Sequence, residues 1–227
     1  SHKKANEYFL KAAELGHIQS QHEMGLRYYY GYWVPQSYDL AFKWIFSAAH
    51  YGDVEAQYNL GHMYYHGQGV EQSYEEAVKW YRIAADQGNS DAQFNLGCAY
   101  NSGEGVEQSD EEAVKWYRLA ADQGYASAQY NLGCMYANGE GVEQSYEEAA
   151  KWYRLAADQG KANAQFNLGD MYRCGGQGVE QSDEEAVKWY RLAADQGDAH
   201  AQNNLGLMYE YGSGVEQSDE EALGWFR

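Results

Sequence analysis

Basic side chains are scarce in this chain, which has 16 lysines and arginines against 34 acidic residues and a net charge of -18. The acidic excess is spread evenly, because each copy of an internal repeat carries four acids and two bases, for example Glu71, Glu75, Glu76 and Asp86 with Lys79 and Arg82. A uniformly acidic surface repels phosphate backbones and anionic lipid headgroups. The charge therefore argues against nucleic-acid and membrane-surface partners.

Long hydrophobic runs and a signal-peptide pattern are both absent from the sequence, so we expect no membrane insertion. Cysteine is also rare, with Cys98, Cys134 and Cys174 only. Cys98 and Cys134 occupy the same position in neighbouring repeats, which should place them beyond disulfide distance. Unpaired thiols favour a reducing, cytoplasmic compartment.

A repeat of 36 residues organises the chain, and the stretch Ala128–Asn163 recurs almost letter for letter. Its copies are marked by six glutamines with gaps of 36, 36, 36, 36 and 37 residues: Gln21, Gln57, Gln93, Gln129, Gln165 and Gln202. A fixed period of this length predicts stacked supersecondary units in place of a single globular core.

Seven segments follow from this period. They are the second helix of a truncated repeat (3–19), a divergent repeat 1 (20–55), repeats 2 to 4 (56–91, 92–127 and 128–163), repeat 5 with a one-residue loop insertion near Gly175–Gln177 (164–200), and a truncated repeat 6 (201–227). Both ends cut through a repeat, so we expect a fragment of a longer array without its natural N-terminus. The array should be monomeric, although its truncated ends could pack end to end.

Each repeat is predicted to be a helical hairpin. Ala56, Leu60 and Met63 fall on one face of a first helix, and Gly61 in that face leaves room for another helix to approach. A glycine loop follows, and Ser73 with Glu76 predicts a reciprocal capping box at the start of the second helix.

These repeats resemble the Sel1-like repeat family, whose units are related to tetratricopeptide repeats. The resemblance rests on AxxxLGxxYxxGxGV at Ala92–Val106 and AxxWYxxAAxxG at Ala113–Gly124, and it extends over Ala5–Arg227. Glu71 and Ser73 stand where the family often has proline and aspartate. The resemblance implies an all-α solenoid, a right-handed superhelix whose first helices line the concave side, acting as a protein-binding scaffold or adaptor.

Comparison of the copies separates repeated positions from variable ones. Three variable positions lie on the first helix, and across the copies they hold Leu26, His62, Cys98, Cys134, Asp170 and Leu207; Tyr29, Tyr65, Asn101, Ala137, Arg173 and Glu210; and Tyr30, His66, Ser102, Asn138, Cys174 and Tyr211. These positions match those that touch a bound peptide in tetratricopeptide arrays. Selection for recognition and relaxed drift at exposed positions predict the same pattern.

We therefore expect a protein or peptide partner to contact a set of aromatic, histidine and amide side chains: Tyr29, Tyr30, Tyr32, Trp33, Tyr58, Asn59, His62, Tyr65, His66, Asn95, Asn101, Asn131, Asn167 and Arg173. The asparagines at the position of Asn59 form a ladder that could hold an extended peptide or bond to neighbouring backbone. Trp33 stands where later copies have glycine, which predicts a differently shaped first loop.

Three alternatives remain open. His62 and His66, one helical turn apart, could form a metal-binding module with Cys98. The array could be a regulatory or inhibitory binding protein, as in toxin neutralisation, or a structural spacer. Catalysis is disfavoured because every plausible Asp, Glu or Ser recurs in each repeat, and no cofactor motif is present.

Overall fold

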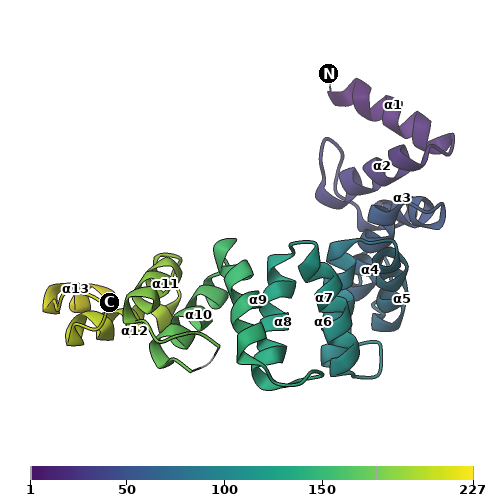
Figure 1. The fold of residues 1–227 in the computed structure, drawn as a ribbon. Helices are drawn as coiled ribbons and strands as arrows, with labels where there is room; N and C mark the ends of the chain where they lie inside the picture. The colour runs from purple at the N-terminus through teal and green to yellow at the C-terminus, as the bar shows by residue number, and fades with distance from the viewer. Residues whose placement is uncertain (1, 177, 227) are drawn as a thin grey trace. The chain divides into compact units, whose positions relative to one another are not determined.

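The chain is described by a computed structural model over residues 2–176 and 178–226, and these residues form thirteen α-helices and no strands (Figure 1). The first helices of the repeats are α2 (Ile18–Tyr30), α4 (Val54–His66), α6 (Ser90–Ser102), α8 (Ala126–Asn138), α10 (Ala162–Cys174) and α12 (Ala199–Tyr211). The second helices are α1 (His2–Glu14), α3 (Tyr38–His50), α5 (Tyr74–Asp86), α7 (Asp110–Asp122), α9 (Tyr146–Asp158), α11 (Asp183–Asp195) and α13 (Asp219–Trp225).

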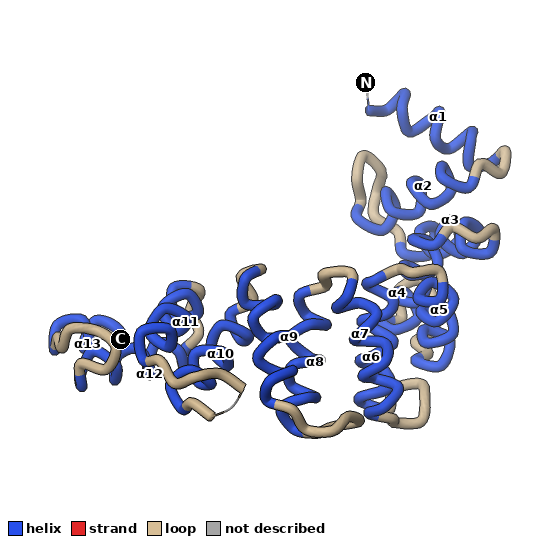
Figure 2. The backbone as a smooth tube through the Cα atoms, viewed as in Figure 1, coloured by secondary structure: helices blue, strands red, loops and turns tan. Residues whose placement is uncertain are grey.

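The helices alternate with short loops along the whole described chain (Figure 2). They form two compact units, one ending at Trp116 and the other beginning at Tyr117. Within each unit, first and second helices pack against their sequence neighbours, as α4 does against α3 and α5. The predicted all-α solenoid is confirmed.

The ends of the helices are capped by side chains and by glycines. Helix α4, the first helix of repeat 2, begins where the carboxylate of Asp53 accepts a hydrogen bond from the Ala56 amide, and it ends at Gly67, which has a left-handed φ of 66°. At the start of α5, the Ser73 hydroxyl accepts a hydrogen bond from the Glu76 amide. These caps satisfy backbone groups of α4 and α5 that have no partner within the helix.

Only half of the predicted capping box forms. The Ser73 amide donates to the Tyr64 carbonyl and is therefore not available to the Glu76 carboxylate. That carboxylate instead pairs with Lys79, one turn further along α5. The reciprocal bond is lost because the loop folds back onto the preceding helix.

Gly61 allows the two helices of a repeat to approach closely, as the sequence predicted. A Cβ atom at Gly61 would lie 2.7 Å from Cδ1 of Tyr81 and 3.1 Å from the Ala77 carbonyl oxygen, both on α5. Tyr81 is almost fully buried in the resulting core together with Leu60 and Leu96. The repeated glycine, leucine and tyrosine positions therefore build the stack.

The repeated glutamines are buried structural links, a role that the sequence analysis missed. Gln57 donates from Nε2 to the Ala49 carbonyl, at the end of α3, over 3.1 Å. Its Oε1 accepts a hydrogen bond from Gln87, in the loop after α5, at 2.6 Å. One amide thus satisfies a helix-end carbonyl and joins two successive repeats.

The repeated arginines link neighbouring helices through cation–π contacts with aromatic rings. Arg82 lies over the rings of Tyr100 and Trp116, 5.5 Å from each centroid. Such contacts stabilise by about 0.5–2 kcal/mol each. Arg118 and Arg154 make equivalent contacts in the second unit.

Candidate binding surface

The variable positions of the first helices lie at the surface of both units. The position of His66 is exposed in all six copies, and the positions of His62 and Tyr65 are half-buried or exposed. None of them is fully buried, although Tyr29, Tyr65 and Cys134 pack against the edge of the core. The repeated positions of the same helices, such as Ala56, Leu60 and Met63 on α4, are fully buried.

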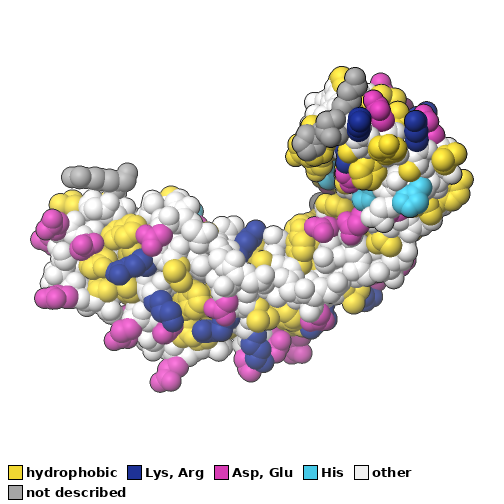
Figure 3. Space-filling view, turned by 90° about the horizontal axis from the view of Figure 1, so that it is seen from above, with side chains coloured by type: hydrophobic (Ala, Val, Ile, Leu, Met, Phe, Trp, Pro, Cys, Tyr) yellow, Lys and Arg dark blue, Asp and Glu magenta, His cyan; other side chains and the backbone are white. Residues whose placement is uncertain are grey.

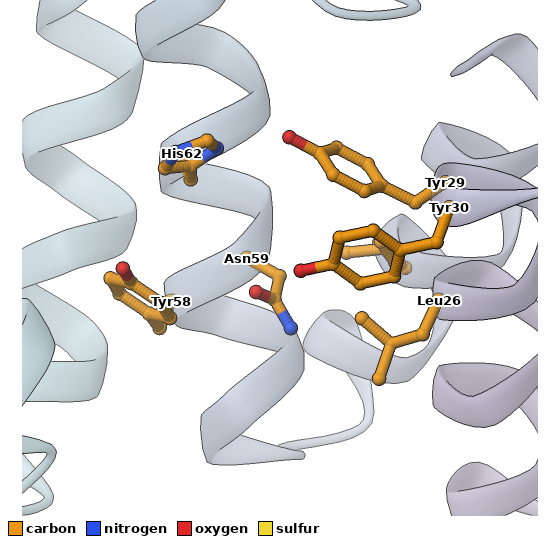
Figure 4. A pocket seen from close by; sticks show the side chains of 7 residues that line it. Leu26, Tyr29, Tyr30, Tyr58, Asn59 and His62 are labelled. Atoms are coloured by element: carbon orange, nitrogen blue, oxygen red, sulfur yellow. The ribbon is translucent and has the colours of Figure 1, made fainter.

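In the first unit these positions surround a pocket between α2 and α4 (Figure 4). Its lining residues are Leu26, Tyr29, Tyr30, Ile45, Tyr58, Asn59 and His62. The Tyr29 and Tyr30 rings project from α2 toward the α4 helix that carries Asn59 and His62 (Figure 4). The pocket has a volume of about 100 Å³, smaller than the roughly 300–1,000 Å³ typical of small-molecule and cofactor sites.

A continuous run of aromatic contacts begins at this pocket. The Tyr29 ring meets the rings of Tyr30 and His62 edge-on, with centroids 4.9 and 6.4 Å apart. His62 in turn lies 4.3 Å from His66, and His66 lies 5.0 Å from Tyr65. The structure thus brings together five of the residues that the sequence singled out.

The run continues past Tyr30 to the loop after α2. The Tyr30 and Tyr32 rings are stacked at 5.2 Å, and Trp33 follows at 6.1 Å. These three side chains are 56–58% exposed. Exposed tyrosine and tryptophan are the side chains that most often anchor protein interfaces.

Burial and neighbouring carboxylates set the protonation of this surface. Burial raises the pKa of Tyr29 and Tyr58, and the charge of Asp91 adds to the effect at Tyr58. A hydrogen bond from the Tyr65 hydroxyl to Glu104 raises the pKa of Tyr65 to about 12. Burial, and secondarily the nearby His66, lowers the pKa of His62. At neutral pH the tyrosines are therefore hydroxyl donors and His62 is uncharged.

The asparagine ladder is largely occupied by contacts within the array. The Asn59 amide nitrogen lies 2.9 Å from Nε2 of His22, Asn95 donates to the Asp91 carbonyl, and Asn204 donates to the Asp170 carboxylate. Asn131 and Asn167 hold the equivalent, half-buried places in the second unit. The geometry favours the structural interpretation of the ladder, with Asn59 also lining a pocket.

Variable positions also line pockets in the second unit. One pocket, between α8 and α10, is bordered by Ala137, Tyr146, Tyr153, Asn167, Asp170 and Met171. Another, between α10 and α12, is bordered by Arg173, Gln181, Asp183, Asn204, Leu207, Met208, Tyr211 and Ser213. Equivalent places in successive repeats thus present different chemistry.

Two further predicted residues are tied to neighbouring side chains. Asn101 donates to Asp110 at 3.3 Å. Arg173 donates from Nε to the Tyr190 hydroxyl at 3.0 Å, and the same hydroxyl donates to Asp170. Arg173 is nevertheless exposed and lines a pocket. The hydrogen bond to Tyr190 orients its guanidinium there.

The prediction of a differently shaped loop at Trp33 is wrong. Trp33 takes a φ of 59°, close to the 71° of Gly69 at the equivalent place. The loop keeps its conformation, because Gly31 before it still ends α2 with a left-handed φ of 74°. A non-glycine residue in this region costs about 1–2 kcal/mol, which the contact of Arg27 with the Trp33 ring at 5.2 Å offsets in part.

In the other copies, the position equivalent to Trp33 is glycine for a second reason, which is the close approach of another helix. A Cβ atom at Gly69 would lie 2.2 Å from the Tyr38 carbonyl oxygen, at the start of α3. Gly105, Gly178 and Gly214 approach the start of a preceding second helix equally closely. These positions need glycine for packing between repeats as well as for backbone conformation.

The one-residue insertion near Gly175–Gln177 does not shorten the helices on either side of the loop. Gln177 lies outside the described residues, while Gly175 and Gly176 have φ values of 66° and 68°. The helices on either side, α10 and α11, each keep 13 residues. Cys174, at the end of α10, is an exposed thiol.

The metal-binding alternative lacks a complete ligand set. Over residues 2–176 and 178–226, no three His, Cys, Asp or Glu side chains are grouped so that they could share a metal ion. His62 and His66 are adjacent but contribute two ligands, whereas protein zinc sites use at least three. The same described part of the chain has no helix with the length and apolar character to span a membrane.

Charged side chains of both signs alternate with apolar patches over the second unit (Figure 3). On α9 and α11, lysines pair with glutamates three residues away, as Lys188 does with Glu185 at 3.4 Å. Most of these pairs are exposed and contribute little to stability. The repeated charges therefore form a solvated face, as the even distribution in the sequence predicted.

Stacked helix pairs with a 36-residue period define an α/α solenoid protein of the tetratricopeptide-like class. Within that class, the chain belongs to the Sel1 repeat family, whose model matches residues 1–17, 18–53, 54–89, 90–125, 126–161, 162–198 and 199–227. Repeats of this kind typically mediate binding to proteins or peptides and are generally not enzymatic.

Solved structures share this fold. A protective antigen of uropathogenic Escherichia coli strains, c5321, is 40% identical with a TM-score of 0.94 over 96% of this chain. The present chain spans about half of that protein, 47% of its length. A Sel1 repeat protein from Oxalobacter formigenes is 31% identical with a TM-score of 0.81, covering 98% of this chain and 91% of that one.

A more distant structure is YrrB, described as a tetratricopeptide repeat protein with an unusual peptide-binding site. It is 20% identical with a TM-score of 0.51, covering 80% of this chain and 88% of that one. At this identity the likeness concerns the fold alone. No curated protein matches the sequence.

Proposed function

We propose that this chain is a protein-binding scaffold that holds a polypeptide partner against the first helices of its repeats. The main support is that positions differing between copies line the pockets between successive first helices, beside repeated positions such as Asn59 and Asn167. Other repeated positions of these helices, such as Leu60 on α4, are fully buried. Pockets that differ in chemistry at equivalent places suit a partner whose successive side chains differ. YrrB, which shares the fold, is described as having a peptide-binding site, and this is consistent with the proposed role.

Within the first unit, the aromatic surface formed by Tyr29, Tyr30, His62, Tyr65 and His66 is the proposed main contact. Its rings are held by contacts with one another, so little conformational entropy is lost on binding. Tyr30 and His66 are the exposed members. They would make the largest direct contribution to affinity.

Selection of random displayed peptides on the immobilised chain tests this proposal. We expect enriched peptides whose binding weakens at least about tenfold for Tyr30→Ala, in line with the cost of losing an interface anchor. Ile83→Ala removes an exposed apolar side chain, 42% accessible, from second helix α5 and should leave binding unchanged. Enrichment of no peptide, or equal effects of the two substitutions, would refute the proposal.

A further inference from the structure

We infer that the pocket between α2 and α4 receives the cationic head group of an arginine or lysine from the bound partner. The inference rests on the proposed function and names the chemistry that this pocket selects. Four aromatic side chains line the pocket: Tyr29, Tyr30, Tyr58 and His62. Aromatic ring faces attract cations through their negative quadrupole, by about 0.5–2 kcal/mol for each contact.

Size and lining favour a single side chain as the occupant. A volume of about 100 Å³ admits the end of one side chain and not a cofactor. None of the seven lining residues is charged, so no cation of the protein already fills the place. The chain applies the same chemistry internally, where Arg82 lies over the Tyr100 and Trp116 rings.

Hydrogen-bond acceptors face the same space. The Asn59 amide nitrogen is engaged by His22, which leaves the amide oxygen of Asn59 as an acceptor at the pocket. The Tyr29 and Tyr30 side chains point from α2 toward α4 (Figure 4). The Tyr29 hydroxyl donates to Oε1 of Gln68 at 2.7 Å and can still accept a hydrogen bond. Guanidinium and ammonium groups are donors without acceptors, so this lining suits them.

The surrounding charge is complementary to a basic partner. Glu55 and Asp91 lie close enough to Tyr58 for their charges to raise its pKa, and Glu104 accepts a hydrogen bond from Tyr65. The whole chain carries a net charge of -18. A basic segment would therefore be attracted at long range and oriented at short range, whereas an acidic segment would be repelled.

An NMR titration of the full chain with labelled tyrosine and histidine tests the inference. The probes are N-acetyl-arginine methylamide and its citrulline counterpart, which has nearly the same shape without the charge. We expect the arginine probe to shift the Tyr30 and His62 ring signals saturably, with the citrulline probe several-fold weaker. Added salt should weaken the arginine probe further.

Substitutions at Tyr30 distinguish the contribution of its aromatic ring to probe binding from the contribution of apolar packing. Tyr30→Phe should retain binding of the arginine probe, whereas Tyr30→Leu should weaken it about two- to thirtyfold, the equivalent of one cation–π contact. Tyr51→Leu changes an exposed tyrosine that follows second helix α3 and does not line the pocket, so it should have no effect on these signals.

Equal affinity for the two probes, or full binding by Tyr30→Leu, would overturn the inference. The peptide selection distinguishes this failure from failure of the proposed function. Selected peptides that need Tyr30 but contain no arginine or lysine would refute the cationic occupant and leave the scaffold role standing. A basic residue common to the selected peptides, whose replacement by citrulline or norleucine abolishes binding, would support both.

Discussion

His62 on the aromatic surface both contacts neighbouring rings and sets the charge of the pocket through its own protonation. His62 lies between Tyr29 on α2 and His66 one turn along α4, and Tyr58 lies one turn before it. Burial disfavours its charged form, and a charged His66 would disfavour it further. The pocket is therefore uncharged at neutral pH, although it is lined by a group that acid can charge.

Acidification should weaken both the fold around His62 and the binding of a cation. The folded-state pKa of His62 is below the unfolded value of 6.5, so its contribution to stability is complete above pH 6.5 and is lost as pH falls through the folded pKa. Protonation would also repel a cationic probe. Histidine NMR signals followed from pH 8 to pH 5 report the pKa, and the arginine probe reports binding.

The variant His66→Gln separates the two causes of the lowered pKa. It removes the charge of His66, so the pKa of His62 should rise while burial keeps it below 6.5. His62→Gln should remove the part of the pH dependence that belongs to this residue. A wild-type pKa at or above 6.5, or tighter binding of the arginine probe at pH 5, would contradict this account.

Trp33 illustrates which residue-level features the sequence could not predict. A tryptophan in a glycine position indicates strain, but not whether the loop changes shape or the residue accepts a positive φ. The outcome depends on Asn6, which donates to the Trp33 carbonyl at 3.0 Å, and on Arg27, which lies over its ring. These partners come from other elements, and the local sequence does not place them.

At the scale of elements, the helix pair is the unit that repetition stabilises. Its periodicity and loop glycines could be predicted because they are local. The link through Gln57 could not, because its partner Gln87 lies 30 residues away and its position depends on how α5 packs against α4. The sequence does carry one signal of such a link, because a glutamine recurs at the position of Gln57 on an otherwise apolar helix face in every copy.

The close approach of α4 and α5 predicts a specific cost for added volume. Gly61→Ala should destabilise the chain by about 1–3 kcal/mol, because the new methyl group would meet the Tyr81 ring at 2.7 Å. Gly224→Ala has no heavy atom within 4 Å of the new methyl group and should be neutral or slightly stabilising. Urea unfolding measures both changes, and equal midpoints for the two variants would contradict the packing account.

At the scale of the whole molecule, repetition separates construction from recognition. The buried positions recur because each copy must pack against the next, and a stack of this kind gains stability from nearest-neighbour interfaces. The variable positions do not form the buried core, although some contact the next repeat, as Tyr65 does through Glu104, and they line pockets in both units. The sequence could predict this division from its own copies, whereas the aromatic pocket and its carboxylate surroundings required the fold.

The most direct test removes recognition while leaving the frame intact. Tyr30→Ser with His66→Ser gives both exposed positions the residue that the third copy carries as Ser102. Exposed substitutions of this kind usually change stability by less than about 0.5 kcal/mol, so urea unfolding should stay close to wild type. Affinity for a peptide selected on the wild-type chain should fall at least about tenfold. Undiminished affinity in this doubly substituted chain would contradict the claim that the variable positions bind the partner.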